Sequence, residues 1–418
     1  MSHTTAGPRR PTGADRQDER LNERESIRGA ITGFVDRVRA GDLGAVPVIA
    51  GLIIIWVIFQ ALNSVFLSSA NLVNLSIEMS PVGVIALGIV VVLLVGQIDL
   101  SVGSMSGLSA AVVAILFVNH GWPLVAAVLV AILTGTAVGF IYGAMFNRFG
   151  VPSFVATLAG LLALLGLQLE SLGNAGAINI PFDSFLVKFA SLLFVPKWLS
   201  YLIVVAAAAW PFLGRYRLAR ARGRAGLSAR PIQLIAVQSL GLLVILGVVA
   251  FFLNRTRGVS WMFVFFVALT IAMNYALTRT KWGRSVFAVG GNAEAARRAG
   301  IKVQRIYLSA FVICSTLAAV GGILAAARLA AANNSTGTGD VNLDAIAAAV
   351  IGGTSLFGGR GSAYAALLGI LVIQSISSGL TLLNLSSGLR FLITGVVLLL
   401  AVAIDSIARR SRASHGRA

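Results

Sequence analysis

The chain has 418 residues, of which 57% are apolar and only 11% are charged, and its mean hydropathy is +0.89. An ordinary soluble domain is about one quarter charged and exposes much of its surface to water, so a soluble fold of this composition is excluded. The formal charge of +18 would indicate nucleic acid in a soluble protein, but here it indicates basic loops beside a membrane, and no nucleic-acid partner is expected.

Residues 1–45 form a polar segment rich in Arg, Asp and Glu. The first apolar run begins too late for a signal peptide, so we expect a cytoplasmic N-terminal tail. Two descriptions fit this tail: a disordered segment, or a segment that contains an amphipathic helix at about 27–38.

From Pro47 to residue 405, apolar runs follow one another with short interruptions. A membrane-crossing helix needs about 20 apolar residues, so the pattern predicts an all-α polytopic membrane protein of about 10–12 helices. The domain would cover 46–405 and be followed by a cytoplasmic tail at 406–418. The expected spans are 46–66, 78–96, 103–118, 123–146, 153–171, 199–213, 232–253, 259–277, 308–327, 362–382 and 388–405.

The distribution of basic residues predicts the orientation. With the N-terminus inside, the loops at 147–152, 214–231, 278–307 and 406–418 are cytoplasmic and hold 18 of the 25 basic residues after residue 45. The opposite loops hold five, which fits the positive-inside rule. The Arg-rich loop 214–231 is expected to be a solvated loop near anionic lipid.

The first glycine-interrupted segment runs from Gly96 to Ser104 and reads GQIDLSVGS. Among the eight acids after residue 45, Asp99 is the one expected at membrane depth, because Glu78, Glu170 and Asp405 fall at span ends and the others in loops. Asp99 either caps the helix that follows or faces a path through the membrane.

The loop 278–307 contains the signature of a short helix. Asn292 is a suitable N-cap, Glu294 lies in the first turn, and Gly300 is suited to the position after the helix. The predicted helix Ala293–Ala299 has only two turns and cannot be stable alone, so we expect it to dock on a partner protein. A plain helix at the membrane interface is the alternative.

A second glycine-interrupted segment covers 343–361, and its apolar part, 345–357, is too short for a standard span. Glycine pairs at 352–353 and 358–359 end it, which predicts a broken or re-entrant helix or close helix packing. The number of crossings in this region stays open.

Several kinds of catalytic chemistry have no residues to support them. No lysine precedes Ser or Thr, so no P-loop exists, and neither Gly-x-Ser-x-Gly nor His-Glu-x-x-His occurs. With Cys314 as the one cysteine and three histidines in total, we expect no metal and no cofactor. The chain is therefore not expected to be an enzyme.

Three motifs together resemble a known family. The run from Glu294 to Gly300 is similar to the EAA loop of ABC importer permeases, although the Ile and Leu-Pro that follow there are missing. The segments 96–104 and 343–361 resemble those of the ribose/xylose branch of ABC monosaccharide importer permeases, with Gln97 in place of a glycine. The resemblance runs from about Asn71 to Asp405, and its extra hydrophobic pair within 172–258 is similar to the longer xylose-type members.

The resemblance implies a permease subunit in the bacterial plasma membrane that moves a monosaccharide, xylose or a similar pentose, into the cytoplasm by alternating access. It implies an ABC ATPase subunit, an extracytoplasmic sugar-binding protein, and a second copy of the chain, since an ATPase dimer needs two docking loops. The implied docking residues are Gly291, Asn292, Glu294, Ala295, Ala296 and Gly300. The candidate path residues are Gln97, Asp99, Ser101, Gly353, Thr354 and Ser355.

Two other functions stay open at this point. One is an ABC permease for another small solute, such as a branched-chain amino acid or an autoinducer. The other is a stand-alone secondary carrier or channel, which the scarcity of acids at membrane depth disfavours.

Overall fold

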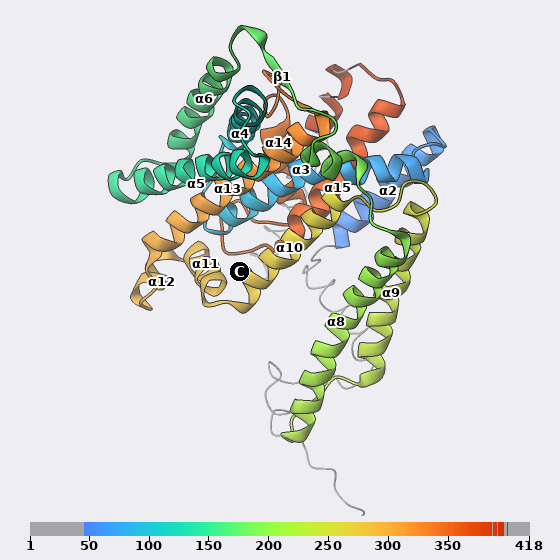
Figure 1. The fold of residues 1–418 in the computed structure, drawn as a ribbon. Coiled ribbons are helices and arrows are strands. Elements are labelled where there is room, and N and C mark those ends of the chain that lie inside the picture. The colour runs from blue at the N-terminus through green and yellow to red at the C-terminus, as the bar shows by residue number, and fades with distance from the viewer. Residues whose placement is uncertain (1–45, 387, 391, 397–398, 400–418) are drawn as a thin grey trace, which may run out of the picture. The chain divides into compact units, whose positions relative to one another are not determined.

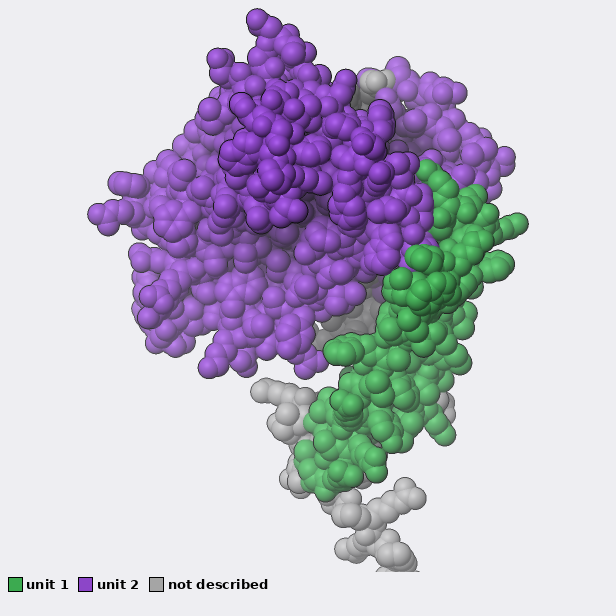
Figure 2. Space-filling model, viewed as in Figure 1, with its two compact units in different colours: residues 1–43, 196–258, 410–418 green, residues 44–195, 259–409 purple. Residues whose placement is uncertain are grey.

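The computed structural model describes residues 46–386, 388–390, 392–396 and 399. The predicted N-terminal tail, the C-terminal tail at 406–418 and much of the predicted span 388–405 lie outside these residues. The chain divides into two compact units (Figure 2): unit 1 is described for residues 196–258, and unit 2 for the described residues of 44–195 and 259–409.

Unit 2 contains most of the helices and a small sheet (Figure 1). Strands β1 (Ala177–Asn179) and β2 (Ala331–Asn333) pair antiparallel, with Ile178 opposite Ala332. The π-helical turns η1 and η3 cover Ile115–Asn119 and Lys188–Leu192, and the 3₁₀ turn η2 covers Gly173–Ala175. The α-helices are α2 (Val46–Leu62), α3 (Ser69–Leu94), α4 (Val102–Ala114), α5 (Leu124–Phe149), α6 (Ser153–Leu172), α7 (Phe185–Val187), α10 (Trp261–Arg279), α11 (Lys281–Gly291), α12 (Ala293–Arg298), α13 (Val303–Leu329), α14 (Val341–Ile351) and α15 (Tyr364–Leu382).

Within the described residues, nine helices are long and apolar enough to cross a membrane. Two apolar helices are shorter: α2 has 17 residues and α14 has 11. This arrangement confirms an all-α polytopic membrane protein. One boundary was wrong: the span expected at 78–96 begins at Ser69, where the Ser68 hydroxyl accepts a hydrogen bond from the Asn71 backbone nitrogen at 3.2 Å.

The centre of unit 2 is the antiparallel pair α3 and α13, which run between two ends of the unit. α13 begins soon after α12 and ends just before β2. α3 runs in the opposite direction, because its Gly88 faces Cys314 whereas Gly321, further along α13, faces Pro81. We call these ends the α12 side and the strand side. Helix α3 is the most enclosed candidate span, with 89% of its apolar window buried.

Helix α5 lies along α13 (Figure 1), and small residues set their distance. A Cβ atom at Gly139 would lie 2.5 Å from the carbonyl oxygen of Phe311, so only glycine allows this approach. Gly135 and Gly143 face α13 in the same way. This stripe of small residues therefore serves helix packing.

Two short helices, α4 and α14, begin part-way along their longer neighbours. The Asn342 side-chain oxygen in the first turn of α14 accepts a hydrogen bond from the Gly103 backbone nitrogen in the first turn of α4, so the two N-termini lie side by side. α4 packs on α13, and α14 packs on α3. The broken segments expected from the glycine-rich motifs are therefore present, and α14 covers most of the short apolar stretch.

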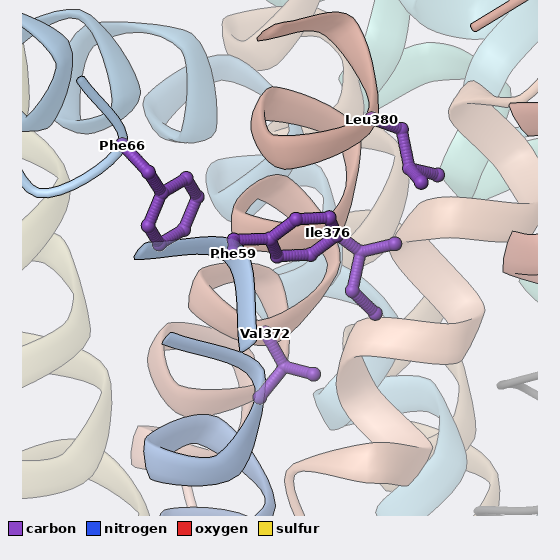
Figure 3. Packing of buried hydrophobic residues seen from close by; sticks show 5 residues of the cluster. All are labelled: Phe59, Phe66, Val372, Ile376 and Leu380. Carbon is purple, nitrogen blue, oxygen red and sulfur yellow. The ribbon is translucent and has the colours of Figure 1, made fainter. Parts of the chain in front are cut away.

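A hydrophobic cluster joins α2 to α15. Phe59 lies against Val372 and Ile376, with Phe66 and Leu380 beside them (Figure 3). Next to this cluster, the indole Nε1 of Trp56 donates a hydrogen bond to the Ser375 hydroxyl at 2.9 Å. These contacts fix one face of α15 against α2.

Unit 1 consists of α8 (Lys197–Arg224) and α9 (Ile232–Leu253), which pack against each other. The Asn254 amide donates a hydrogen bond to Ser200 at one end of the pair, and Arg215 donates one to Gln238 further along. The predicted loop 214–231 was wrong in its first half, because α8 continues to Arg224. Apolarity ends at residue 213, but Ala and Arg are strong helix formers and carry the helix on.

Candidate functional site

Helix α12 has the ends that the sequence predicts. The Asn292 side-chain oxygen accepts a hydrogen bond from the Ala295 backbone nitrogen at 2.9 Å, so Asn292 is the N-cap. The helix ends at Arg298, one residue before the predicted end, and Gly300 turns the chain away at φ +83°. Both predicted cap positions are confirmed.

The exposed face of α12 is polar. The Glu294 carboxylate accepts hydrogen bonds from Arg297 at 3.0 Å and from Arg298 at 3.3 Å. Ala295 is exposed between these residues, as are Gly291 and Asn292 at the start of the helix. Exposed ion pairs of this kind contribute little stability, so the six-residue helix depends on packing.

Ala296 provides that packing and faces into unit 2, where it is only 4% exposed. Its carbonyl oxygen also accepts a hydrogen bond from the Ile301 nitrogen at 3.0 Å. The expectation that Ala296 faces a partner was wrong. One face of this short helix packs against the rest of the unit, and the small Ala296 side chain lies on that face. The surface that α12 offers consists of Glu294, Ala295, Arg297 and Arg298.

The helix before α12 connects this surface to the two glycine-rich segments. A Cβ atom at Gly290, near the end of α11, would collide with the Leu94 carbonyl oxygen and lie 2.6 Å from the Gly359 nitrogen. The Gly359 nitrogen itself donates a hydrogen bond to the Leu94 oxygen at 2.9 Å. We call residues 94–96, 290 and 358–359 the three-loop junction.

The junction also brings the two sequence motifs together. A Cβ atom at Gly96 would lie 3.4 Å from the Phe357 carbonyl oxygen, so segments more than 250 residues apart in the chain are neighbours. Because these contacts are between backbones, a displacement of α11 must move both loops or break the contact.

The candidate path residues of the first motif are mostly enclosed. Asp99 and Ser101 are fully buried, whereas Gln97 is half-buried. The Asp99 carboxylate accepts hydrogen bonds from the backbone nitrogen and hydroxyl of Ser101 at 2.8 and 2.7 Å. Asp99 therefore lies beside the start of α4, but both bonds go to Ser101, and no side-chain hydrogen bond caps the helix. A capping role for Asp99 stays a prediction, and so does its role in a path.

The candidate path residues of the second motif lie after α14. Gly353 is exposed at φ +103°, Thr354 is buried, and Ser355 is half-buried. The Ser355 nitrogen donates a hydrogen bond to the Arg360 carbonyl oxygen at 2.9 Å and closes the loop. The structure therefore gathers the six candidates into two adjoining loops on the α12 side.

A polar cluster deeper in the unit escaped the sequence analysis. Glu78 was expected at a span end, but it is the tenth residue of α3, roughly 13 Å along the helix. Its carboxylate accepts a hydrogen bond from the Gln374 amide at 2.9 Å, and its other oxygen lies 3.8 Å from Arg328. Arg328 was expected in a loop and lies in the last turn of α13. The Ser68 cap was the one signal that could have moved the start of α3 outward.

Comparison with known proteins identifies the family. The family model described as the permease component of a branched-chain amino acid transport system matches residues 71–402. The chain belongs to this permease family. No solved structure matches the chain.

Curated relatives of this permease include sugar permeases. The xylose transport system permease protein XylH of Escherichia coli K12 is 34% identical over 385 residues, which cover 91% of this chain and 96% of that protein. The XylH of Haemophilus influenzae is 33% identical over a match that covers 83% of this chain and 91% of that protein. The ribose import permease protein RbsC of E. coli K12 is 31% identical over a match that covers 85% of this chain and 91% of that protein.

Proposed function

We propose that this permease is the membrane-spanning subunit of an ATP-driven importer for a monosaccharide, xylose or a similar pentose. The observation that carries the proposal is the 34% identity along nearly the whole length of XylH. The family description names branched-chain amino acids, so an amino-acid substrate is the second candidate. Uptake of labelled xylose, ribose and leucine, compared between a deletion strain and the same strain with the gene restored, separates the sugar substrate from the amino-acid substrate.

The proposed partners follow from the exposed surface of α12 and from the two-fold symmetry expected of an ATPase dimer. We expect the exposed face of α12 to bind an ABC ATPase subunit, with a second copy of the chain beside the first. An extracytoplasmic sugar-binding protein would deliver the solute on the strand side. Motion of the ATPase would reach the loops after α3 and α14 through α11 and the three-loop junction.

In the proposed orientation the permease lies in the bacterial plasma membrane, and its α12 side faces the cytoplasm. In a Cys314→Ala background, Ala299→Cys and Arg220→Cys should resist an impermeant thiol reagent added to intact cells, because both would be inside. Ser335→Cys, which is exposed near β2, should react and serves as the matched control. Ready labelling of Ala299→Cys from outside would reverse the orientation.

The proposed energy source is ATP, since the described spans hold few ionisable groups for a proton relay. Uptake by proteoliposomes that contain the permease and its ATPase should persist when an uncoupler removes the proton gradient. Collapse of uptake with ATP still present would instead favour a secondary carrier.

A further inference from the structure

A stripe of polar side chains follows the enclosed central helices on the strand side. Between Val73 and Leu94 of α3, the residues that are not buried are Asn74, Glu78 and Val82. They are spaced four residues apart and therefore lie on one face of the helix. Across from this face, Gln374 of α15 contacts Glu78. We call Asn74, Glu78, Arg328, Gln374 and Ser377 the α3–α15 polar stripe.

The exposure of the charged pair shows what surrounds it. The Glu78 side chain is 40% exposed and the Arg328 side chain 33% exposed, although α3 is the most enclosed candidate span. Their closest approach of 3.8 Å is too long for a direct hydrogen bond. The two charges are therefore not closed onto each other as a buried structural pair would be.

Open charges at this depth require water or a polar ligand. Hydrocarbon cannot solvate a carboxylate, and charged residues within spans face a bundle interior or a water-filled cavity. α15 supports this view, because Gln374 and Ser377 lie on its less buried face while Ser375 is fully buried against Trp56. The stripe is thus a polar, accessible surface along α3 and α15.

The chemistry of the stripe suits a neutral polyhydroxylated solute. A carboxylate accepts hydrogen bonds from adjacent hydroxyls, an amide both donates and accepts, and a guanidinium donates. We propose that the α3–α15 polar stripe lines the path on the strand side and that Glu78 and Gln374 bind the hydroxyls of the passing solute. This inference rests on the proposed monosaccharide transport.

The first arm of the test measures water access and needs no solute. In the Cys314→Ala background, Ser377→Cys should react with an impermeant thiol reagent applied from the strand side. Ser375→Cys, two residues away on the buried face of the same helix, should not react. Ser377→Cys as unreactive as Ser375→Cys would overturn the proposal.

The second arm measures transport by the reconstituted complex with its ATPase and binding protein. Glu78→Gln should lower sugar uptake about tenfold, as expected for the loss of a hydrogen bond to a charged group, while ATP hydrolysis stimulated by the binding protein is kept. Glu170→Gln removes an exposed acid from α6 and should change neither rate. A Glu78→Gln uptake rate within about twofold of the Glu170→Gln rate would also overturn the proposal.

The two arms separate this inference from the proposed function. If the unsubstituted complex carries no monosaccharide, the proposed function fails, whereas the Ser377→Cys reaction still decides whether the stripe lines a water-filled path. Thermal unfolding of Glu78→Gln shows whether the variant folds; a melting temperature equal to that of the unsubstituted protein assigns any lost uptake to the path.

Discussion

Ala295→Trp should prevent the permease from holding the proposed ATPase subunit. Ala295 lies at the centre of the exposed face of α12, between Glu294 and the arginines that pair with it. A large ring at the centre of a close-packed interface costs about 2 kcal/mol or more, which corresponds to roughly 30-fold weaker binding. Co-purification of the ATPase with the variant from membranes measures the effect.

Two controls separate docking from folding. Ala295→Ser adds one oxygen atom and should retain the ATPase, and Ala163→Trp places the same bulk on the exposed face of α6. Ala296→Trp is a poor probe, because the buried Ala296 would clash within its own chain. If Ala295→Trp retains the ATPase at the unsubstituted level, the docking surface lies elsewhere, and the end of α8 with its arginines becomes the next candidate.

The sequence predicted those features of α12 that depend on neighbouring residues. Asn292 and Gly300 define the ends of the helix through their own side chain and backbone freedom, so a local pattern was sufficient. The direction of Ala296 was not predictable, because a six-residue helix offers too few turns to reveal which of its faces is buried. That face is set by the packing of α11, α12 and α13.

Features that depend on contacts between distant segments could not be predicted from the sequence. Hydropathy alone placed the start of α3 at residue 78, since Asn71, Asn74 and Glu78 lower the mean of the first turns. In the structure the same residues are tolerated because they face a polar surface shared with α15. Two of the polar residues that obscured the helix boundary, Asn74 and Glu78, thus belong to the α3–α15 polar stripe.

The three-loop junction illustrates the same limit. Gly96, Gly290 and Gly359 each belong to a motif with a local explanation, as a break, a helix end or a glycine pair. Their shared property, contact between three backbones, appears only when the segments are placed together. Gly290 is far along the chain from both candidate path segments, so its contact with them could not be predicted from the sequence.

Gly290→Ala should uncouple ATP hydrolysis from transport. The new Cβ would meet the Leu94 carbonyl oxygen and the Gly359 nitrogen, and overpacking of this kind costs about 1–3 kcal/mol. Separation of α11 from the two loops relieves the clash, so α12 can still bind the ATPase without transmitting its motion. Sugar uptake per ATP hydrolysed in proteoliposomes should fall by about tenfold or more.

The adjacent residue supplies a matched control for this change. Gly291→Ala makes the same substitution where a Cβ would meet nothing within 4 Å. Because Gly291 is also a predicted docking residue, retention of the ATPase is measured in parallel, and with the ATPase retained the coupling should be unchanged. Alanine favours helix over glycine at both positions, which leaves the junction contact as the difference between the two variants. A Gly290→Ala complex that keeps its ATPase, melts at the unsubstituted temperature and transports as well as Gly291→Ala would show that the junction does not carry the motion. Loss of the ATPase from Gly290→Ala alone would instead mean that the junction positions α12 for docking.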